Sequence, residues 1–237
     1  MDEIGLHGEQ NATGNSRVIE SAQDGPHRDL LSLLERHLAH PFRKPILDYN
    51  RAAYASACAA HAAWNPVAPL ILDAGCGVGW STLRLAEAFP GHFVFGVDQS
   101  VDRIERGKPA QLPANACLVR ADLVDFWRLL AADGVHLARH YNLYPNPWPK
   151  IGHLARRWQG HAVFPIWREL GGIVECRSNW RIYIEEMALA LQRLSGQPVA
   201  VEPYVTDDPM TPFERKYLAS GHRLWRCRLD FAAGEQE

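Results

Sequence analysis

The sequence lacks any long apolar run. No stretch of its 237 residues approaches the roughly 18 consecutive apolar side chains that a membrane-spanning helix needs, so no membrane span is expected. The N-terminal sequence MDEIGLHGEQNATGNSR is polar and lacks the apolar core of a secretory signal. Cysteine is also scarce: the five cysteines stand far apart and form no CxxC pair. We therefore expect neither a disulfide framework nor a cysteine zinc site, and we expect a cytoplasmic location.

The chain also has little net charge, because 25 basic and 27 acidic residues give −2. Apolar residues make up 47% and charged residues 22%, values that exclude a wholly disordered or collagen-like chain. The charge is nevertheless uneven, since residues 150–181 carry six bases and two acids. A nearly neutral protein can thus present a cationic face to an anionic partner, although a solvated surface explains the same residues equally well.

Low-complexity composition is confined to the N-terminus. Residues 1–27 are rich in Gly, Asn, Ser and Asp without hydrophobic periodicity, which predicts a disordered tail. Residues 28–237 are expected to form a single domain, because their length suits one hydrophobic core. Within that domain, the amphipathic stretch 29–38 and the alanine-rich stretch 46–63 predict an N-terminal helical segment over residues 28–66.

Strand-like and helix-like stretches then alternate along the chain. Strands are predicted from PLILDAG, HFVFGVD, ACLVRAD and, more weakly, HLARHYNLY, with helices from WSTLRLAEAF, SVDRIERG and LVDFWRLLAA. This alternation favours an α/β fold with a mostly parallel sheet covered by helices on both faces. The later stretches GGIVECRS, WRIYIEEMALALQRL, PVAVEPYV and HRLWRCRLDF predict a strand, a helix and two final strands.

A glycine-rich loop, DAGCGVG, follows the first predicted strand and contains Gly75, Gly77 and Gly79. Glycines here let the chain turn sharply and let a ligand approach bare backbone amides. A dinucleotide fingerprint requires G-x-G-x-x-G, but the third glycine comes one place early and position 80 is tryptophan. D-x-G-x-G-x-G is the form found in S-adenosylmethionine (SAM) methyltransferases, so SAM is the favoured cofactor. A nicotinamide or flavin dinucleotide, or a purely structural loop, stays open as an alternative.

Acids follow three successive predicted strands, at Asp73, Asp98 and Asp122. Because the carboxyl ends of parallel strands meet at one edge of a sheet, we expect these acids to lie near the glycine loop. Asp73 would order the ammonium group of SAM, Asp98 would accept from the ribose hydroxyls, and Asp122 from the adenine amino group. A helix N-cap or a solvated turn explains each acid taken singly, most readily Asp98, which precedes Ser100.

A rigid segment, NLYPNPWPK, follows the fourth predicted strand. Its three closely spaced prolines fix the backbone and forbid a helix. Asn146 offers an amide donor and acceptor, and Trp148 a flat aromatic face, a combination that suits a planar heterocycle. A proline-stiffened crossover with a buried tryptophan is the alternative. Arg156 and Arg157, which follow this segment, would meet phosphates, or else form the exposed start of a helix.

Six segments follow one another along the chain: LDAGCGVGWSTLRLAEAFP, FGVDQS, RAD, YPNPWPK, SNWRIYIEEM and TPFE. Together they resemble the bacterial tRNA (guanine-N7)-methyltransferase family over about residues 69–230. Many families share the glycine loop, whereas PxPWPK followed much later by TxFE is specific. The resemblance implies a Rossmann-like class I SAM-dependent methyltransferase, with a mostly parallel seven-stranded sheet and an antiparallel final strand. It also implies SAM as the cofactor, tRNA as the partner and guanine N7 as the methyl acceptor.

The resemblance further assigns roles to single residues. Asp73, Asp98 and Asp122 match the SAM-binding acids of the family. Asn146 matches the active-site aspartate of the PDPW motif, which makes it the candidate catalytic residue and a candidate cofactor contact. Lys150, Asn179, Thr211, Phe213 and Glu214 match substrate-contacting positions of the family. Trp148, Arg156 and Arg157 complete the residues expected to bind the substrate, on the grounds of their own side chains.

Two positions depart from the family pattern, because Asn146 and Asn179 stand where the family has aspartates. Guanine N7 carries a free lone pair, so its methylation needs no base and depends mainly on orientation. Each amide would weaken a charged hydrogen bond by about 1 kcal/mol, or roughly tenfold in rate. A small heterocyclic metabolite as substrate, and a non-catalytic SAM- or RNA-binding protein, therefore stay open. No metal is expected, since His136 and His140 lack further ligands nearby in the sequence.

Overall fold

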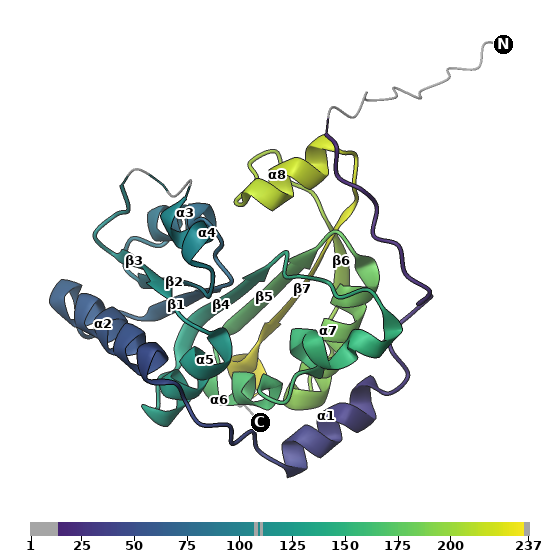
Figure 1. Ribbon diagram of the computed structural model, residues 1–237, viewed down its shortest axis with the longest axis horizontal. Helices are drawn as coiled ribbons and strands as arrows, with labels where there is room; N and C mark the ends of the chain where they lie inside the picture. The colour runs from purple at the N-terminus through teal and green to yellow at the C-terminus, as the bar shows by residue number, and fades with distance from the viewer. Residues whose placement is uncertain (1–13, 107–108, 110, 235–237) are drawn as a thin grey trace.

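A seven-stranded sheet in the order β3-β2-β1-β4-β5-β7-β6 organises the part of the chain that the structure describes (Figure 1). The computed structural model describes residues 14–106, 109 and 111–234. Strands β1 to β5 pair in parallel, β7 runs antiparallel to β5, and β6 runs antiparallel to β7. The predicted mostly parallel sheet with an antiparallel final strand is thus confirmed. The strands are β1 (Leu70–Ala74), β2 (Phe93–Asp98), β3 (Ala116–Arg120), β4 (Leu137–Leu143), β5 (Ile173–Ser178), β6 (Val201–Tyr204) and β7 (Leu224–Asp230).

Helices cover both faces of this sheet, and the alternation of side chains along the strands shows how. Leu70 and Leu72 of β1 belong to a large apolar cluster with residues of α1, α2, α5, α6 and α7, whereas Ile71 belongs to a second cluster with residues of α3. Every residue of β1 and β2 is buried, as expected for parallel strands that are covered on both faces. The α-helices are α1 (Leu30–Ala39), α2 (Asp48–Trp64), α3 (Trp80–Ala88), α4 (Val101–Glu105), α5 (Leu123–Ala132), α6 (Trp167–Leu170), α7 (Arg181–Ser195) and α8 (Pro212–Ala219).

The helical N-terminal segment over residues 28–66 contains α1 and α2, as predicted. Sequence patterns did not reveal the short helices after β4, because none is long enough to show a hydrophobic period. These are the 3₁₀ helices η1 (Ile151–Arg156), η2 (Trp158–Gly160) and η3 (Phe164–Ile166), followed by α6. A further 3₁₀ helix, η4 (Phe231–Gly234), follows β7. Among the described residues, no helix is long and apolar enough to cross a membrane.

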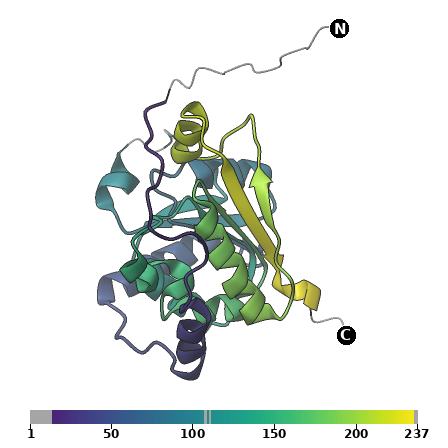
Figure 2. The ribbon, with the colours of Figure 1, turned by 90° about the vertical axis from the view of Figure 1, so that its right-hand side faces the viewer.

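The described part of the expected tail differs from the disordered segment predicted over residues 1–27. Residues 14–27 are extended and run from α8 past α7 to α1 (Figures 1 and 2). The Gly14 amide donates to the Ala219 carbonyl at 2.7 Å, and Gln23 Nε2 donates to Glu186 at 2.6 Å. Polar composition did not predict this path because the segment is held through hydrogen bonds more than through apolar burial. Residues 1–13 lie outside the described residues, where disorder stays a prediction.

A fully buried histidine lies in the middle of β4. The His140 ring packs against Trp127 and Trp167, with ring centroids 5.7 and 4.3 Å away, and is completely buried. Trp127 Nε1–H donates to His140 Nε2 at 3.2 Å, so that nitrogen carries no proton. Burial lowers the pKa of His140 to about 3, and the ring is therefore neutral at physiological pH.

We expect His140 to make the protein less stable as the pH falls. The pKa of an exposed histidine is 6.5, against about 3 here, so between these values the unfolded chain binds the additional proton. The stability from the neutral ring is fully present above pH 6.5 and declines by up to about 1.4 kcal/mol per pH unit toward pH 3. Urea unfolding of wild type and His140→Gln at neutral pH and near pH 5 checks this. The free energy of unfolding of wild type should fall further than that of the variant, and equal losses would contradict the prediction.

Candidate functional site

The glycine loop turns at the carboxyl end of β1. Gly75, Gly77 and Gly79 have φ values of 80°, 60° and 86°, in the left-handed region that favours glycine. A Cβ atom added to Gly75 or Gly77 would meet nothing within 4 Å, whereas one at Gly79 would lie 2.8 Å from the Leu118 side chain. The first two glycines therefore leave open space against the backbone, and the third permits close packing against β3.

Asp73, at the end of β1, is buried and anchors the helix that follows the glycine loop. Ser81 Oγ and Thr82 Oγ1 both donate to its Oδ2 atom, at 2.6 and 2.7 Å. Burial raises the pKa of Asp73 to about 6, against the opposing effect of these two hydrogen bonds. Asp73 thus fixes the first turn of α3 against β1, and the predicted contact of Asp73 with SAM stays a prediction.

Asp98, at the end of β2, lies beneath the glycine loop. Its Oδ2 accepts from the Gly77 amide at 3.1 Å, and its Oδ1 accepts from the Ser100 amide at 2.8 Å. The carboxylate therefore orients the loop and also stands beside the open space in front of Gly75 and Gly77. A carboxylate next to such a cradle suits the ribose hydroxyls of an adenosine-bearing cofactor.

Asp122, after β3, caps α5, because its Oδ1 accepts from the Val124 amide at 2.9 Å. Its own amide donates to Asn50 Oδ1 at 2.9 Å, which ties it to α2. The Asp122 side chain lines a small hollow together with Phe42, Leu47 and other residues. The three acids thus lie at the carboxyl ends of adjacent strands, and each also has a local structural role.

Residues 145–150, hereafter the PNPWPK loop, leave β4 with an uncommon backbone. Tyr144 and Trp148 have φ values of 52° and 46°, which are costly for residues with a side chain. Asn146 is exposed, and its Oδ1 accepts from the Trp148 amide at 3.2 Å. The Arg156 guanidinium lies 4.9 Å from the centre of the Trp148 ring, and the His153 ring packs edge-on at 5.5 Å. Arg156 therefore already contacts the ring that was expected to face a heterocycle.

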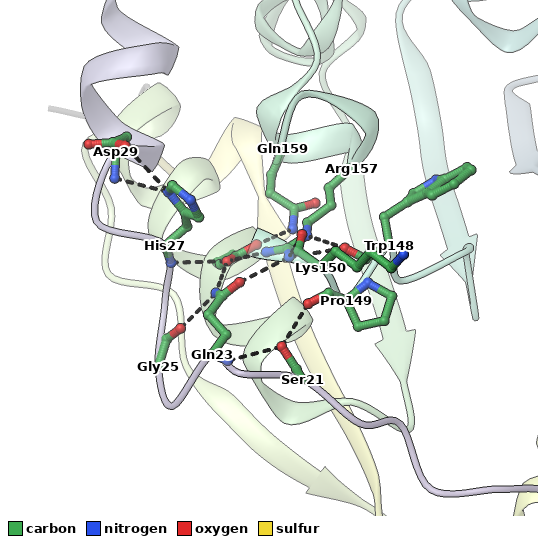
Figure 3. A network of polar contacts seen from close by, with 11 residues as sticks. Ser21, Gln23, Gly25, His27, Asp29, Trp148, Pro149, Lys150, Arg157 and Gln159 are labelled. Atoms are coloured by element: carbon green, nitrogen blue, oxygen red, sulfur yellow. Dashed lines mark hydrogen bonds and ion pairs between the residues drawn. The ribbon is translucent and has the colours of Figure 1, made fainter. Parts of the chain in front are cut away.

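The structure contradicts the predicted phosphate contact of Arg157, because its side chain is completely buried. Its Nη1 donates to the Glu186 carboxylate at 2.5 Å, and its Nε and Nη2 donate to the Trp148 carbonyl at 3.1 and 3.0 Å (Figure 3). Arg157 thus holds the backbone of the PNPWPK loop. Its neighbour Arg156 is exposed, as is Lys150, and both stay predicted RNA contacts.

The TPFE segment, residues 211–214, begins α8. Thr211 Oγ1 accepts from the Glu214 amide at 2.9 Å, and Glu214 Oε2 accepts from the Met210 amide at 2.6 Å, an arrangement close to a capping box. Glu214 is completely buried and also accepts from Tyr144 Oη at 2.6 Å and from Arg177 at 3.1 Å. The predicted substrate contact of Glu214 is therefore wrong, since its carboxylate is enclosed by these donors.

Two other predicted substrate residues keep accessible surface. Phe213 is 46% exposed at the start of α8, and its ring stacks on Tyr217 with centroids 6.2 Å apart. Asn179 follows β5, and its Nδ2 atom lies 3.0 Å from His222 Nδ1, while His222 Nε2 lies 3.2 Å from the Ser16 carbonyl. Thr211 itself is buried as the cap of α8. Among the described residues, no group of three or more His, Cys, Asp or Glu side chains could hold a metal ion.

The strand order, the open glycine loop and the acids at the carboxyl edge define a class I SAM-dependent methyltransferase. The profile of a family described as "Putative methyltransferase" matches residues 67–227. The tRNA (guanine-N(7)-)-methyltransferase of Stutzerimonas stutzeri is 30% identical over 173 residues, covering 68% of this chain and 72% of that protein. The enzyme of the same name from Bordetella pertussis is 33% identical over 184 residues, covering 69% and 68%. The chain belongs to the family of the tRNA (guanine-N(7)-)-methyltransferases.

A 16S rRNA (adenine(1408)-N(1))-methyltransferase from Catenulisporales acidiphilia is 22% identical and matches with a TM-score of 0.49, covering 78% of this chain and 92% of that chain.

Proposed function

We propose that this protein transfers a methyl group from SAM to N7 of a guanine in tRNA. The observation that carries the proposal is the family match over residues 67–227, joined by relatives of that name at 30% and 33% identity. The site supports it, because the exposed Asn146 follows β4, whose carboxyl end lies beside the glycine loop. Two exposed cations, Lys150 and Arg156, accompany Asn146 and suit a phosphate backbone.

This reaction requires the protein to orient the two reactants and requires no proton transfer. SAM supplies a methyl group on a positively charged sulfur, and guanine N7 supplies a free lone pair. Asp98 and the open backbone at Gly75 and Gly77 fit the cofactor side of this reaction. The residues of the PNPWPK loop and Phe213 would then hold guanine N7 in line with the methyl group of SAM. Such alignment of the two reactants accounts for much of the rate enhancement of a well-oriented site.

Asn146 is the candidate contact to the base, and it is neutral where the family has an acid. The Asn146 Oδ1 atom accepts a hydrogen bond from the Trp148 backbone amide at 3.2 Å. This bond orients the side-chain amide of Asn146 relative to the loop. A charged acceptor at this position would strengthen hydrogen bonds to the guanine edge. We therefore expect Asn146→Asp to raise kcat/KM for tRNA roughly tenfold and Asn146→Ala to lower it by a similar factor.

Methyl transfer from labelled SAM into bulk tRNA lacking 7-methylguanine, followed by nucleoside analysis, tests the proposal. We expect label in 7-methylguanine, with kcat/KM falling steeply as salt concentration rises, because RNA binding releases counterions. SAM binding without incorporation into any nucleoside would overturn the proposal in favour of a non-catalytic protein. Salt-insensitive methylation of a small heterocycle, with tRNA inert, would equally overturn it.

A further inference from the structure

Residues 14–27, hereafter the strap, alternate between inward and outward side chains in their second half. Ser21, Gln23 and His27 are partly buried, whereas the intervening Ala22 and Asp24 are exposed. This alternation is that of an extended chain lying on a surface. The strap therefore presents a defined inner face to the domain, and the residues of that face can be separated experimentally from their outward neighbours.

The inner face of the strap contacts the PNPWPK loop directly and through one buried arginine (Figure 3). Ser21 Oγ donates to the Pro149 carbonyl at 2.6 Å. Gln23 Oε1 accepts from Arg157 Nη2 at 2.9 Å, and the same guanidinium donates to the Trp148 carbonyl. Two consecutive carbonyls of the loop are thus held by groups that the strap supplies or orients.

The same residues satisfy a buried carboxylate on α7. Glu186 is completely buried, and its Oε1 accepts from Arg157, from Gln23 Nε2 at 2.6 Å and from the His27 amide at 3.0 Å. Gln159 Nε2 donates to the other oxygen at 2.9 Å. A buried charge needs such donors, so removal of the strap's contribution loosens the ion pair on which the loop depends.

The other end of the strap is attached to α8. The Ser16 amide donates to Ser220 Oγ at 3.0 Å, and the Ser16 carbonyl lies 3.2 Å from His222 Nε2. The strap therefore connects the C-terminal end of α8, the helix that presents Phe213, with the loop that presents Asn146. Figures 1 and 2 agree that it passes along one side of the domain between these two segments.

The PNPWPK loop contains one residue at positive φ, Trp148, and directly follows another, Tyr144, and such a backbone persists only when its surroundings over-determine it. We propose that the strap is a positioning element of the methyl-acceptor site, in which Ser21 and Gln23 hold the PNPWPK loop in the conformation that presents Asn146 to the base. This inference rests on the proposed function. It assigns a role in turnover to a segment that touches no reacting atom.

The test compares full-length Ser21→Ala/Gln23→Ala with wild type and with Asp24→Ala, an outward neighbour in the same segment. We expect the double variant to lower kcat for tRNA methylation about tenfold or more, while its dissociation constant for SAM stays within about twofold. Asp24→Ala should retain wild-type kcat. Ser21→Thr, which keeps the hydroxyl, should behave as wild type. Ser21→Ala alone should lower kcat, and this single variant replaces the double variant in the test if the double variant does not fold.

Hydrogen–deuterium exchange supplies a readout that does not depend on activity. We expect the double variant to speed exchange in peptides covering residues 144–157 and to leave peptides of β1 and α3 unchanged. Unchanged exchange together with unchanged kcat would overturn the inference, as would an equal loss of kcat in Asp24→Ala. If wild type fails to methylate tRNA while the variant still loosens the loop, the proposed function fails and positioning by the strap stands.

Discussion

Replacing Asp98 with alanine is expected to raise the dissociation constant for SAM about a hundredfold or more. The carboxylate stands beneath the open glycine loop and holds the Gly77 amide at 3.1 Å. The two charged hydrogen bonds proposed between Asp98 and the ribose would each be worth about 1.5–3 kcal/mol, and their loss would account for at least this factor. Loss of the bond to Gly77 would add to it, because the loop would no longer be fixed against β2. Isothermal titration of SAM into each variant measures the effect.

Asp102→Ala is the matched control for this experiment. Asp102 lies four residues further on α4, and its side chain is 81% exposed in an ion pair with Arg106. We expect its SAM affinity to equal that of wild type. A folded Asp98→Ala protein that binds SAM within about threefold of wild type would show that Asp98 only orients the loop, and the cofactor assignment would have to be revised.

Replacing Arg157 with methionine is expected to lower the free energy of unfolding by about 3–5 kcal/mol. Both Arg157 and Glu186 are completely buried, with 2.5 Å between the paired atoms, so the variant leaves a buried carboxylate without its cation. The variant also frees the Trp148 carbonyl from two donors. Urea unfolding followed by circular dichroism measures the loss.

Two further variants test whether the loss of stability comes from the buried ion pair or from the removal of a cation alone. Arg156→Met removes an exposed cation at the adjacent position, and we expect it to change stability by no more than about 0.5 kcal/mol. The double variant Arg157→Met/Glu186→Leu removes both buried charges and should recover part of the stability lost in the single variant. Equal losses in Arg156→Met and Arg157→Met would contradict the burial of the pair.

The two arginines also show where prediction from sequence ends. Neighbouring positions with the same side chain carry the same local signal, so both were expected at the surface. Arg157 is buried because Glu186 lies 29 residues later and Gln23 lies 134 residues earlier, and both supply groups that compensate its charge. Glu214 is buried for the same reason, since Tyr144, directly after β4, and Arg177 of β5 both donate to it. Partners of this kind leave no local pattern.

Local sequence patterns alone specify the order of the strands, the helices α1 to α5 and α7, the glycine loop and the family. Each of these rests on local requirements: apolar runs for buried parallel strands, and residues without a side chain where φ is positive, as at Gly75 and Gly77. The exposure of the predicted site residues, by contrast, follows from the tertiary structure, which leaves some of these side chains at the surface and buries others in hydrogen-bond networks. In the first turn of α8, the Phe213 side chain is exposed, whereas the adjacent Glu214 side chain is buried. Residues 14–27 lie along the surface of the domain. Burial of a polar group depends on hydrogen-bond partners, and distant partners come close only when the chain folds.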